Sequence, residues 1–291
     1  MIPKKFDYYA PTSLHEAIQL LSENEEAKVL AGGQSLLGLM KLRLAAPTAL
    51  VDISKLPDLS YVREDGDHLA IGALTTHDTI EHSPTIKRRF TILNEAASKI
   101  GDQQTRNLGT IGGSACHADP AADLPTALRV LDAEFVMQGK KGERVVPAGD
   151  FFVDLFMTAV GYDEVLTEIR IPYLPQNSAS AYIKHSLREH DFGIAIAGAV
   201  LTVGDGNACK DVRIGLGAAG PTPLRATSAE QYLEGKVLDE VTIAEAAQRA
   251  VEGANPPSDL HGSREYRFEM IKVLTRRSLK LAFSRVGLSG M

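Results

Sequence analysis

The sequence predicts an α+β protein built from two parts that meet near residue 175. In the first part, short strand-like and helix-like segments alternate; in the second, three strand-like segments are followed by three helical ones. A run of strands segregated from a run of helices is typical of α+β architecture. The stretch PYLPQN, from Pro172 to Asn177, has the composition of a link between two parts. We therefore expect one domain over 1–175 and a second over 176–291.

Hydrophobic periodicity and turn residues define the elements of the first part. Ser13 and Glu16 have the spacing of a capping box that begins a short helix. A hairpin is expected around Asp65-Gly66. Ser83-Pro84 begins a helix that Gly101 can end. The other expected elements are strands at 28–31, 48–53, 133–138, 143–147 and 165–172, and helices at 35–44 and 122–131.

The second part has a simpler pattern. Its elements are strands at 180–187, 193–204 and 208–217, and helices near 227–235, 241–253 and 261–284. The last helix has one apolar face and several basic residues, which we interpret as a solvated face or a subunit contact.

Composition and charge exclude several classes of protein. The chain has 291 residues, of which 44% are hydrophobic and 23% charged, so it can bury a sizeable core. A net charge of −6, with no basic block interleaved with aromatics, argues against a nucleic-acid partner. No run reaches the roughly 18 apolar residues of a membrane span. The opening MIPKKFDYYAPTS lacks an apolar secretory region, and two cysteines fit a reducing compartment, so we expect a cytoplasmic protein.

The residues provide no catalytic or metal-binding group. Without a C-x-x-C pair, the chain cannot hold its own iron–sulfur cluster in the usual way. The pairs His77/His82 and His185/His190 are five residues apart, which is not the one-face spacing of a helical zinc pair. There is no G-x-S-x-G elbow and no Walker loop.

The stretch GLGAAG, Gly215 to Gly220, matches the dinucleotide fingerprint G-x-G-x-x-G. The fingerprint requires a strand before the glycines and a helix directly after them. Pro221 and Pro223 follow instead, and both favour an extended chain. We therefore interpret the small residues as the end of a strand that packs closely against another element.

Two other glycine pairs point to a ligand. The first glycine segment, residues 29–36, contains Gly32-Gly33 and Ser35; the second, residues 110–114, contains Gly112-Gly113 and Ser114. Paired glycines lose much backbone entropy on folding, so a positive φ or a close approach should require them. Backbone N–H groups and hydroxyls in such segments can bind phosphate, although each segment alone also fits a plain turn. Together they fit a diphosphate held from both sides, in a cofactor that the residues alone do not identify.

Several long stretches resemble one family. They are KVLAGGQSLLGLMKLRLAAPTALVDISKLPDL, IGALTTHDTI, IGDQQTRNLGTIGGSACHADPAADLPTAL, LTEIRIP, AYIKHSLREHDF and GPTPLRA. In this order, over nearly the whole chain, they resemble the FAD-binding medium subunit of molybdenum hydroxylases, the group of aerobic carbon monoxide dehydrogenase and xanthine dehydrogenase. The resemblance implies a PCMH/vanillyl-alcohol-oxidase-type FAD-binding domain with subdomains at about 1–55 and 56–175, followed by a smaller C-terminal domain of a three-stranded sheet plus helices.

The resemblance also implies the cofactor site. The two glycine segments match the family's pyrophosphate loops, Lys184 lies near the flavin's polar edge, and Phe192 either stacks over the ring or is an ordinary core aromatic. Many relatives have asparagine at the position of Ser114, which leaves one side-chain contact open. The implied cofactor-binding residues are Val29, Leu30, Ala31, Gly32, Gly33, Gln34, Ser35, Leu36, Ile100, Thr110, Ile111, Gly112, Gly113, Ser114, Asp123, Leu166, Lys184 and Phe192.

The function implied is that of an oxidoreductase subunit, a flavoprotein that transfers electrons. A large subunit with molybdopterin-bound molybdenum hydroxylates the substrate, and a small subunit carries 2Fe–2S clusters. FAD in this chain passes the electrons to an external acceptor, within a dimer of heterotrimers. Two alternatives stay open: a stand-alone FAD oxidoreductase of the same fold, which would need an acid or base beside the ring, and a scaffold without FAD, against which the intact glycine pairs argue.

Overall fold

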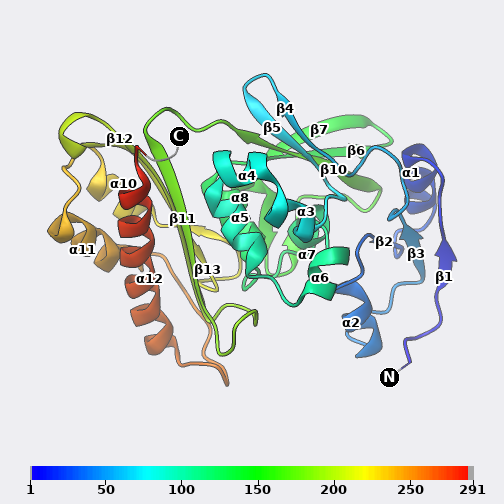
Figure 1. The fold of residues 1–291 in the computed structure, drawn as a ribbon. Helices are drawn as coiled ribbons and strands as arrows, with labels where there is room; N and C mark the ends of the chain where they lie inside the picture. Colours follow the sequence, from blue (N-terminus) through cyan, green and yellow to red (C-terminus); the bar gives the residue numbers. More distant parts are fainter. Residues whose placement is uncertain (1, 288–291) are drawn as a thin grey trace.

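The computed structural model describes residues 2–287 and arranges them in three neighbouring parts that follow the chain order (Figure 1). The N-terminal part is a parallel sheet of order β1-β3-β2 with α1 and α2. Its elements are β1 (Asp7–Tyr9), α1 (Leu14–Glu23), β2 (Lys28–Leu30), α2 (Leu36–Lys41) and β3 (Ala49–Asp52). The cap of α1 is confirmed, since Ser13 accepts from the Glu16 N–H; the Glu16 carboxylate accepts from Thr12 instead of Ser13.

The middle part is built on an antiparallel sheet of order β4-β5-β10-β6-β7. The predicted hairpin is confirmed, because Asp65 pairs with His68 and Gly66 has φ 57°. The strands are β4 (Val62–Asp65), β5 (His68–Gly72), β6 (Glu134–Gly139), β7 (Gly142–Pro147) and β10 (Glu164–Pro172), with a small ribbon of β8 (Phe152–Asp154) and β9 (Met157–Thr158).

Seven short helices accompany this sheet. They are α3 (His77–His82), α4 (Pro84–Arg89), α5 (Thr91–Ser98), α6 (Gln103–Leu108), α7 (Ile111–His117), α8 (Asp123–Val130) and α9 (Ala148–Phe151). The single helix expected from Ser83 to Gly101 is wrong. The chain breaks at Phe90, with φ −139° and ψ 63°, where the ring is fully buried and stacks on Tyr173. Burial of this ring therefore turns the chain between α4 and α5.

The C-terminal part contains the three predicted strands and three predicted helices. The two-residue β14 extends the sheet, whose order is β11-β12-β13-β14. The elements are β11 (Ser178–His185), β12 (Ala195–Val203), η1 (Asp205–Asn207), β13 (Cys209–Gly217), β14 (Leu224–Arg225), α10 (Thr227–Leu233), α11 (Glu240–Arg249) and α12 (Arg264–Arg285). Within residues 2–287, none of the helices combines the length and hydrophobicity needed to cross a bilayer.

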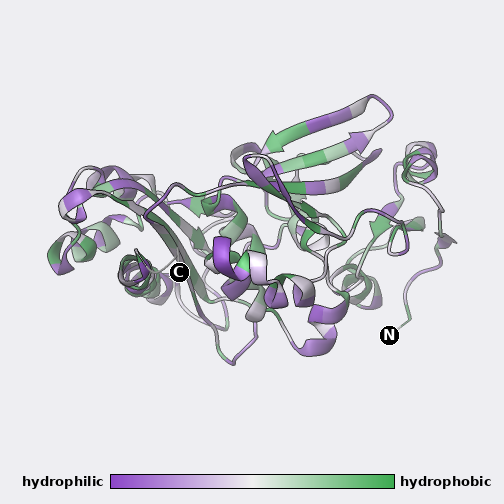
Figure 2. Ribbon diagram, turned by 45° about the horizontal axis from the view of Figure 1, so that its top comes forward, coloured by the Kyte–Doolittle hydropathy of each residue, from purple (hydrophilic) through white to green (hydrophobic). Residues whose placement is uncertain are grey.

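Close packing joins the C-terminal sheet to the middle part. All nine residues of β12 are buried, and both α8 and α12 contact this strand. A Cβ at Gly215 would lie 2.1 Å from Val130 of α8, so only glycine allows β13 to lie against that helix. The interpretation of GLGAAG as a close-packing strand end is confirmed. Figure 2 shows hydrophobic residues (green) within the strands and hydrophilic ones (purple) on many outer helix turns.

Candidate cofactor site

The first glycine segment joins β2 to α2 and has unused backbone donors. Gly33 adopts φ 70°, and Ser35 returns to the right-handed region with φ −105° and ψ −55°. Among residues 2–287, the backbone N–H groups of 33–36 donate to no hydrogen-bond acceptor. Consecutive N–H groups on a chain that alternates between left- and right-handed conformations form a concave anion-binding site. This segment therefore fits a phosphate.

The second glycine segment differs from expectation, because it is the first turn of α7 and not a loop. Thr110 is the N-cap, and its hydroxyl accepts from the Gly113 N–H at 3.0 Å. The N–H of Ile111 donates to Thr75 O and that of Gly112 to Ala73 O. Each backbone N–H from 111 to 114 has an acceptor within the protein. This segment can therefore offer a ligand its side-chain hydroxyls but no free backbone N–H groups.

Packing explains Gly112. Its position is buried, and an added Cβ would lie 2.6 Å from the Cβ and 2.7 Å from the carbonyl oxygen of Ala73. Atoms this close would overlap, so the start of α7 can lie against β5 only with glycine there.

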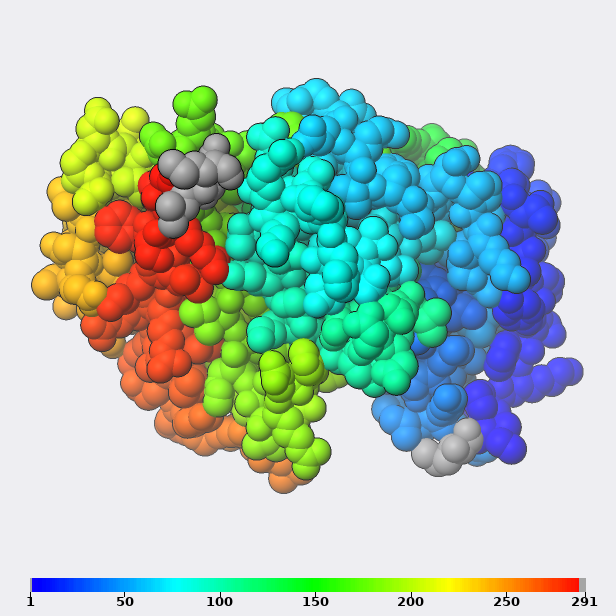
Figure 3. Space-filling view, in the orientation of Figure 1, coloured from blue at the N-terminus to red at the C-terminus, as the bar shows by residue number. Residues whose placement is uncertain are grey.

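The two segments lie side by side. A Cβ at Gly32 would lie 1.9 Å from Leu108 O, and one at Gly113 would lie 3.9 Å from the Cβ of Ala31. Figure 3 shows the surface hollowed between α2 and the loop joining β11 to β12, with α6 above the hollow. An extended ligand held at the first glycine segment can therefore follow this hollow toward the C-terminal part.

His77 lies beneath the junction. A Cβ at Gly109 would lie 2.8 Å from its Nε2, and the His77 side chain is buried, with no partner for Nδ1 among residues 2–287. Burial, helped by the nearby Arg106 charge, lowers the pKa of His77 to about 4. We conclude that this ring is a neutral spacer between α3 and the chain that enters α7.

Where β11 of the C-terminal part lies against the middle part, three side chains form a buried cluster. Asp123, the first residue of α8, accepts from Tyr182 Oη at 2.7 Å and from Lys184 Nζ at 3.0 Å, and the shortest ion-pair distance to Lys184 is 2.9 Å. Lys184 Nζ also donates to Lys99 O at 2.7 Å, so the ammonium joins α8 to the end of α5. Burial raises the pKa of Asp123, and the Lys184 charge and the Tyr182 hydroxyl oppose this rise.

The remaining predicted residues occupy three different settings. Ile100 is half-buried after α5, and Leu166 is buried on β10 within the core of the middle part. Phe192 is 62% exposed in the loop between β11 and β12, so the alternative of an ordinary core aromatic is wrong. The sequence analysis did not include Tyr182 among the site residues. A signal was available, because residues two apart on a strand point to the same face, and Tyr182 and Lys184 have this spacing on a predicted strand.

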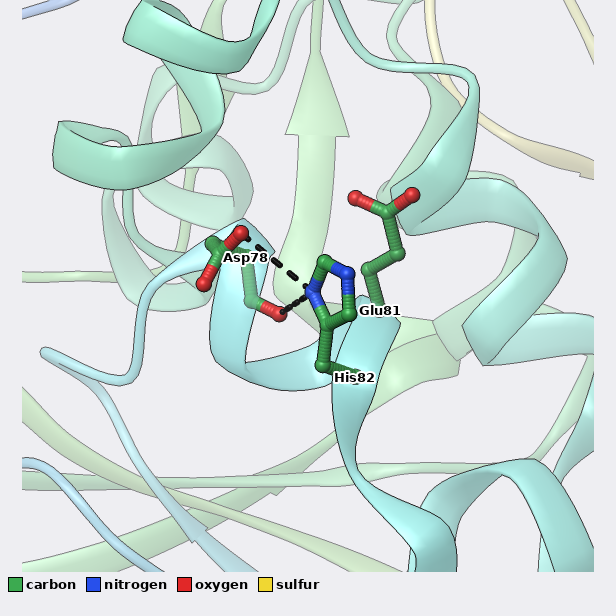
Figure 4. A group of neighbouring side chains, drawn as sticks. All are labelled: Asp78, Glu81 and His82. Carbon is green, nitrogen blue, oxygen red and sulfur yellow. Dashed lines mark hydrogen bonds and ion pairs between the residues drawn. The ribbon is translucent and has the colours of Figure 1, made fainter.

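One further cluster of ligand-type residues, Asp78, Glu81 and His82 on α3, does not require a metal (Figure 4). The Asp78 carboxylate lies 3.3 Å from His82 Nδ1 and accepts from Gln103 at 2.6 Å. Glu81 pairs with Arg106 at 2.7 Å. These partners already neutralise or bind the carboxylates.

Comparisons with known proteins agree with this geometry. Residues 4–174 match the family model of the FAD binding domain in molybdopterin dehydrogenase, and residues 180–282 match that of the CO dehydrogenase flavoprotein C-terminal domain. The carbon monoxide dehydrogenase medium chain of Hydrogenophaga pseudoflava is 40% identical, with 98% of this chain and 99% of that protein aligned. Subunit alpha of the 6-hydroxypseudooxynicotine dehydrogenase complex of Paenarthrobacter nicotinovorans is 39% identical over 98% of this chain and 97% of that protein.

A solved structure shares the whole fold. Quinoline 2-oxidoreductase from Pseudomonas putida 86 superposes with a TM-score of 0.93 at 36% identity, covering 98% of this chain and 99% of the matched chain. Sequence and structure agree over both parts of the molecule, and the expected α+β fold, an FAD-binding domain followed by a C-terminal domain, is confirmed. The chain belongs to the family of FAD-binding medium subunits of molybdenum hydroxylases and is an oxidoreductase component.

Proposed function

We propose that this chain takes electrons from the 2Fe–2S clusters of a small subunit and passes them to an external acceptor, while a large molybdenum subunit hydroxylates the substrate. FAD supplies the chemistry, since a flavin accepts electrons singly and releases them in pairs. The observation that carries the proposal is the run of four N–H groups at 33–36 that have no acceptor among residues 2–287, beside a hollow in a chain of this family.

The residues of the first glycine segment bind the diphosphate. The N–H groups of 33–36 donate to it, and the hydroxyls of Ser35, Thr110 and Ser114 add further donors. The flanking residues Val29, Leu30, Ala31 and Gly32 bring the segment against the start of α7, where Ile111, Gly112 and Gly113 form the facing wall.

The other end of the hollow orients the ring system. Asp123 and Lys184 form its polar edge, and Ile100 and Leu166 contribute apolar contacts. Phe192, which is exposed on the loop between β11 and β12, would hold the ring by stacking. No acid or base for substrate chemistry comes from this chain.

The assembly we propose is a dimer of heterotrimers in the cytoplasm. The relatives named above are a medium chain of carbon monoxide dehydrogenase and a subunit of a dehydrogenase complex, which supports a multi-subunit setting. The proposed domains are 1–175 and 176–291.

The test is flavin content and partnership. The chain is co-expressed with the subunits encoded beside it, purified, and its bound FAD is measured from the visible absorbance spectrum. We expect FAD together with co-purified molybdenum and iron–sulfur subunits. A colourless complex would overturn the FAD site, and a yellow chain that oxidises a substrate without any partner would favour the stand-alone oxidoreductase.

A matched glycine pair isolates the first glycine segment. Gly33 and Gly235 have φ 70° and 73°; an added Cβ has no atom within 4 Å at Gly235, and at Gly33 its nearest neighbour is the flexible side-chain end of Leu37, at 2.9 Å. Changing either to Ala costs about 1–2 kcal/mol of backbone strain. We expect Gly33→Ala to lower FAD affinity at least tenfold and Gly235→Ala to leave it unchanged; equal FAD retention would contradict the assignment.

A further inference from the structure

The buried cluster at the polar end of the hollow connects two domains through one tyrosine. Tyr182 lies on β11, and its backbone N–H donates to Glu95 of α5 at 2.9 Å. Its hydroxyl donates to Asp123 of α8 at 2.7 Å. Tyr182 is 5% exposed, so both contacts are shielded from water. One residue of the C-terminal part thus contacts two carboxylates of the middle part.

Each of these carboxylates has its own cation. Glu95 pairs with Arg285 of α12, which also donates to Ser180 O on β11. Asp123 pairs with Lys184, whose ammonium also donates to Lys99 O at the end of α5. The charged groups that face the cluster from α5, α8, β11 and α12 include Glu95, Asp123, Lys184 and Arg285, and each of the two carboxylates pairs with one of the two cations.

We propose that Tyr182 is a positioning residue that, together with Lys184, keeps Asp123 a carboxylate at the flavin site and links this charge to the docking of the C-terminal domain. The inference rests on the proposed function and adds a residue to that site.

The reason lies in the donors available to Asp123. Burial disfavours a charged carboxylate, and it is offset by hydrogen bonds to the charged form and by a nearby cation. Within residues 2–287, the side-chain donors to Asp123 are Tyr182 and Lys184. Lys184 donates to Asp123 and to Lys99 O, so it holds the Asp123 carboxylate in place and supplies a positive charge beside it.

The consequence concerns the reduction potential of bound flavin. With Asp123 ionised, its charge and that of Lys184 cancel. Without the tyrosine hydroxyl, Asp123 takes a proton from water more readily, and the remaining Lys184 charge stabilises the added electrons. The potential of the variant should then exceed that of the wild type by a margin that grows as the pH falls, whereas at high pH the two potentials should be equal.

The experiment uses the purified complex of the full chain with its partners. Flavin potentials are measured by spectroelectrochemistry from pH 6 to pH 9 for the wild type, Tyr182→Phe and the control Tyr61→Phe. Tyr61 also donates to a carboxylate, that of Glu168. We expect Tyr182→Phe at pH 6 to favour two-electron reduction at least tenfold, a shift of about 30 mV. The control should follow the wild type.

Asp123→Asn provides the second arm. It should show the raised potential at every pH, and adding Tyr182→Phe to it should change nothing further, because the hydroxyl acts through Asp123. If Tyr182→Phe does not fold, an Asp123→Asn potential equal to that of the wild type overturns the inference. A Tyr182→Phe complex with full FAD and an unchanged potential also overturns it, whereas a wild-type complex without FAD overturns the proposed function itself.

Discussion

The pairs Gly32-Gly33 and Gly112-Gly113 look alike in sequence, but the structure uses them differently. At the first pair, a positive φ at Gly33 precedes backbone donors that have no partner among residues 2–287. At the second pair, the chain is helical, and every donor from 111 to 114 is used. Gly32 and Gly112 are both required by packing, against Leu108 and Ala73 respectively, whereas Gly33 leads into backbone donors that fit the phosphate of the proposed cofactor. A glycine motif therefore indicates a close approach but does not identify what approaches.

The largest expected effect follows from packing at the second pair. Gly112→Ala should lower the free energy of unfolding by about 3 kcal/mol, because the new Cβ overlaps the backbone of Ala73. Gly149→Ala is the control, since no atom lies closer than 3.8 Å to its added Cβ. Urea denaturation of both variants measures the difference. Equal stability would mean that Gly112 is not required by packing.

Acid should weaken the junction between the two segments. In the folded protein the pKa of His77 is lowered from 6.5 to about 4. As the pH falls below 6.5, the imidazole therefore takes up a proton in the unfolded chain before it does so in the folded protein, and the free energy of unfolding decreases. From pH 6.5 to pH 5 the loss attributable to His77 should be about 2 kcal/mol. Unfolding of wild type and His77→Phe across this range measures it. If the free energy of unfolding of the wild type depends on pH no more steeply than that of His77→Phe, His77 is not the cause of the acid sensitivity.

A smaller effect is expected at the N-cap of α7. Thr110→Val keeps the shape of the side chain but leaves the Gly113 N–H without its acceptor, which should cost about 1 kcal/mol of stability. Thermal unfolding measures the change. No loss of stability would indicate that the hydroxyl serves only a ligand.

The smallest effect on stability is expected at Ser35. Its side chain makes no cap hydrogen bond, so Ser35→Ala should change the free energy of unfolding by less than about 0.5 kcal/mol. If the hydroxyl donates to the diphosphate, FAD affinity should fall by about 1 kcal/mol, roughly fivefold. Titration of FAD into the flavin-free protein measures this. A Ser35→Ala variant with a lower free energy of unfolding and an unchanged FAD affinity would contradict the assignment of the first glycine segment to the ligand.

Long periodic elements were predictable because their pattern is local. The strands from β10 to β13 and the helix α12 lie close to the expected positions, since each has enough residues to show a period. Short elements such as α3, α6 and β9 were not predicted, because so few residues show no clear hydrophobic period. The break at Phe90 was missed because it depends on a ring buried against distant residues.

The candidate site divides in the same way. Ser35, Thr110 and both glycine pairs could be selected from residue type alone, and the resemblance supplied Asp123 and Lys184. The contact of Lys184 with Lys99 O and the role of Tyr182 could not be predicted, because each joins residues more than 50 positions apart.

The sequence by itself determined the α+β class, the order of the main elements, the family and the glycines at which the backbone must come close to something. Only the tertiary structure decided which of the glycine segments keep backbone N–H groups without an acceptor among residues 2–287 and which use them within the protein. The physical reason is that conformational freedom and hydrophobic period are properties of neighbouring residues. Whether a backbone N–H finds an acceptor depends on chain segments brought together by folding, as Ala73 and Thr75 are at the start of α7.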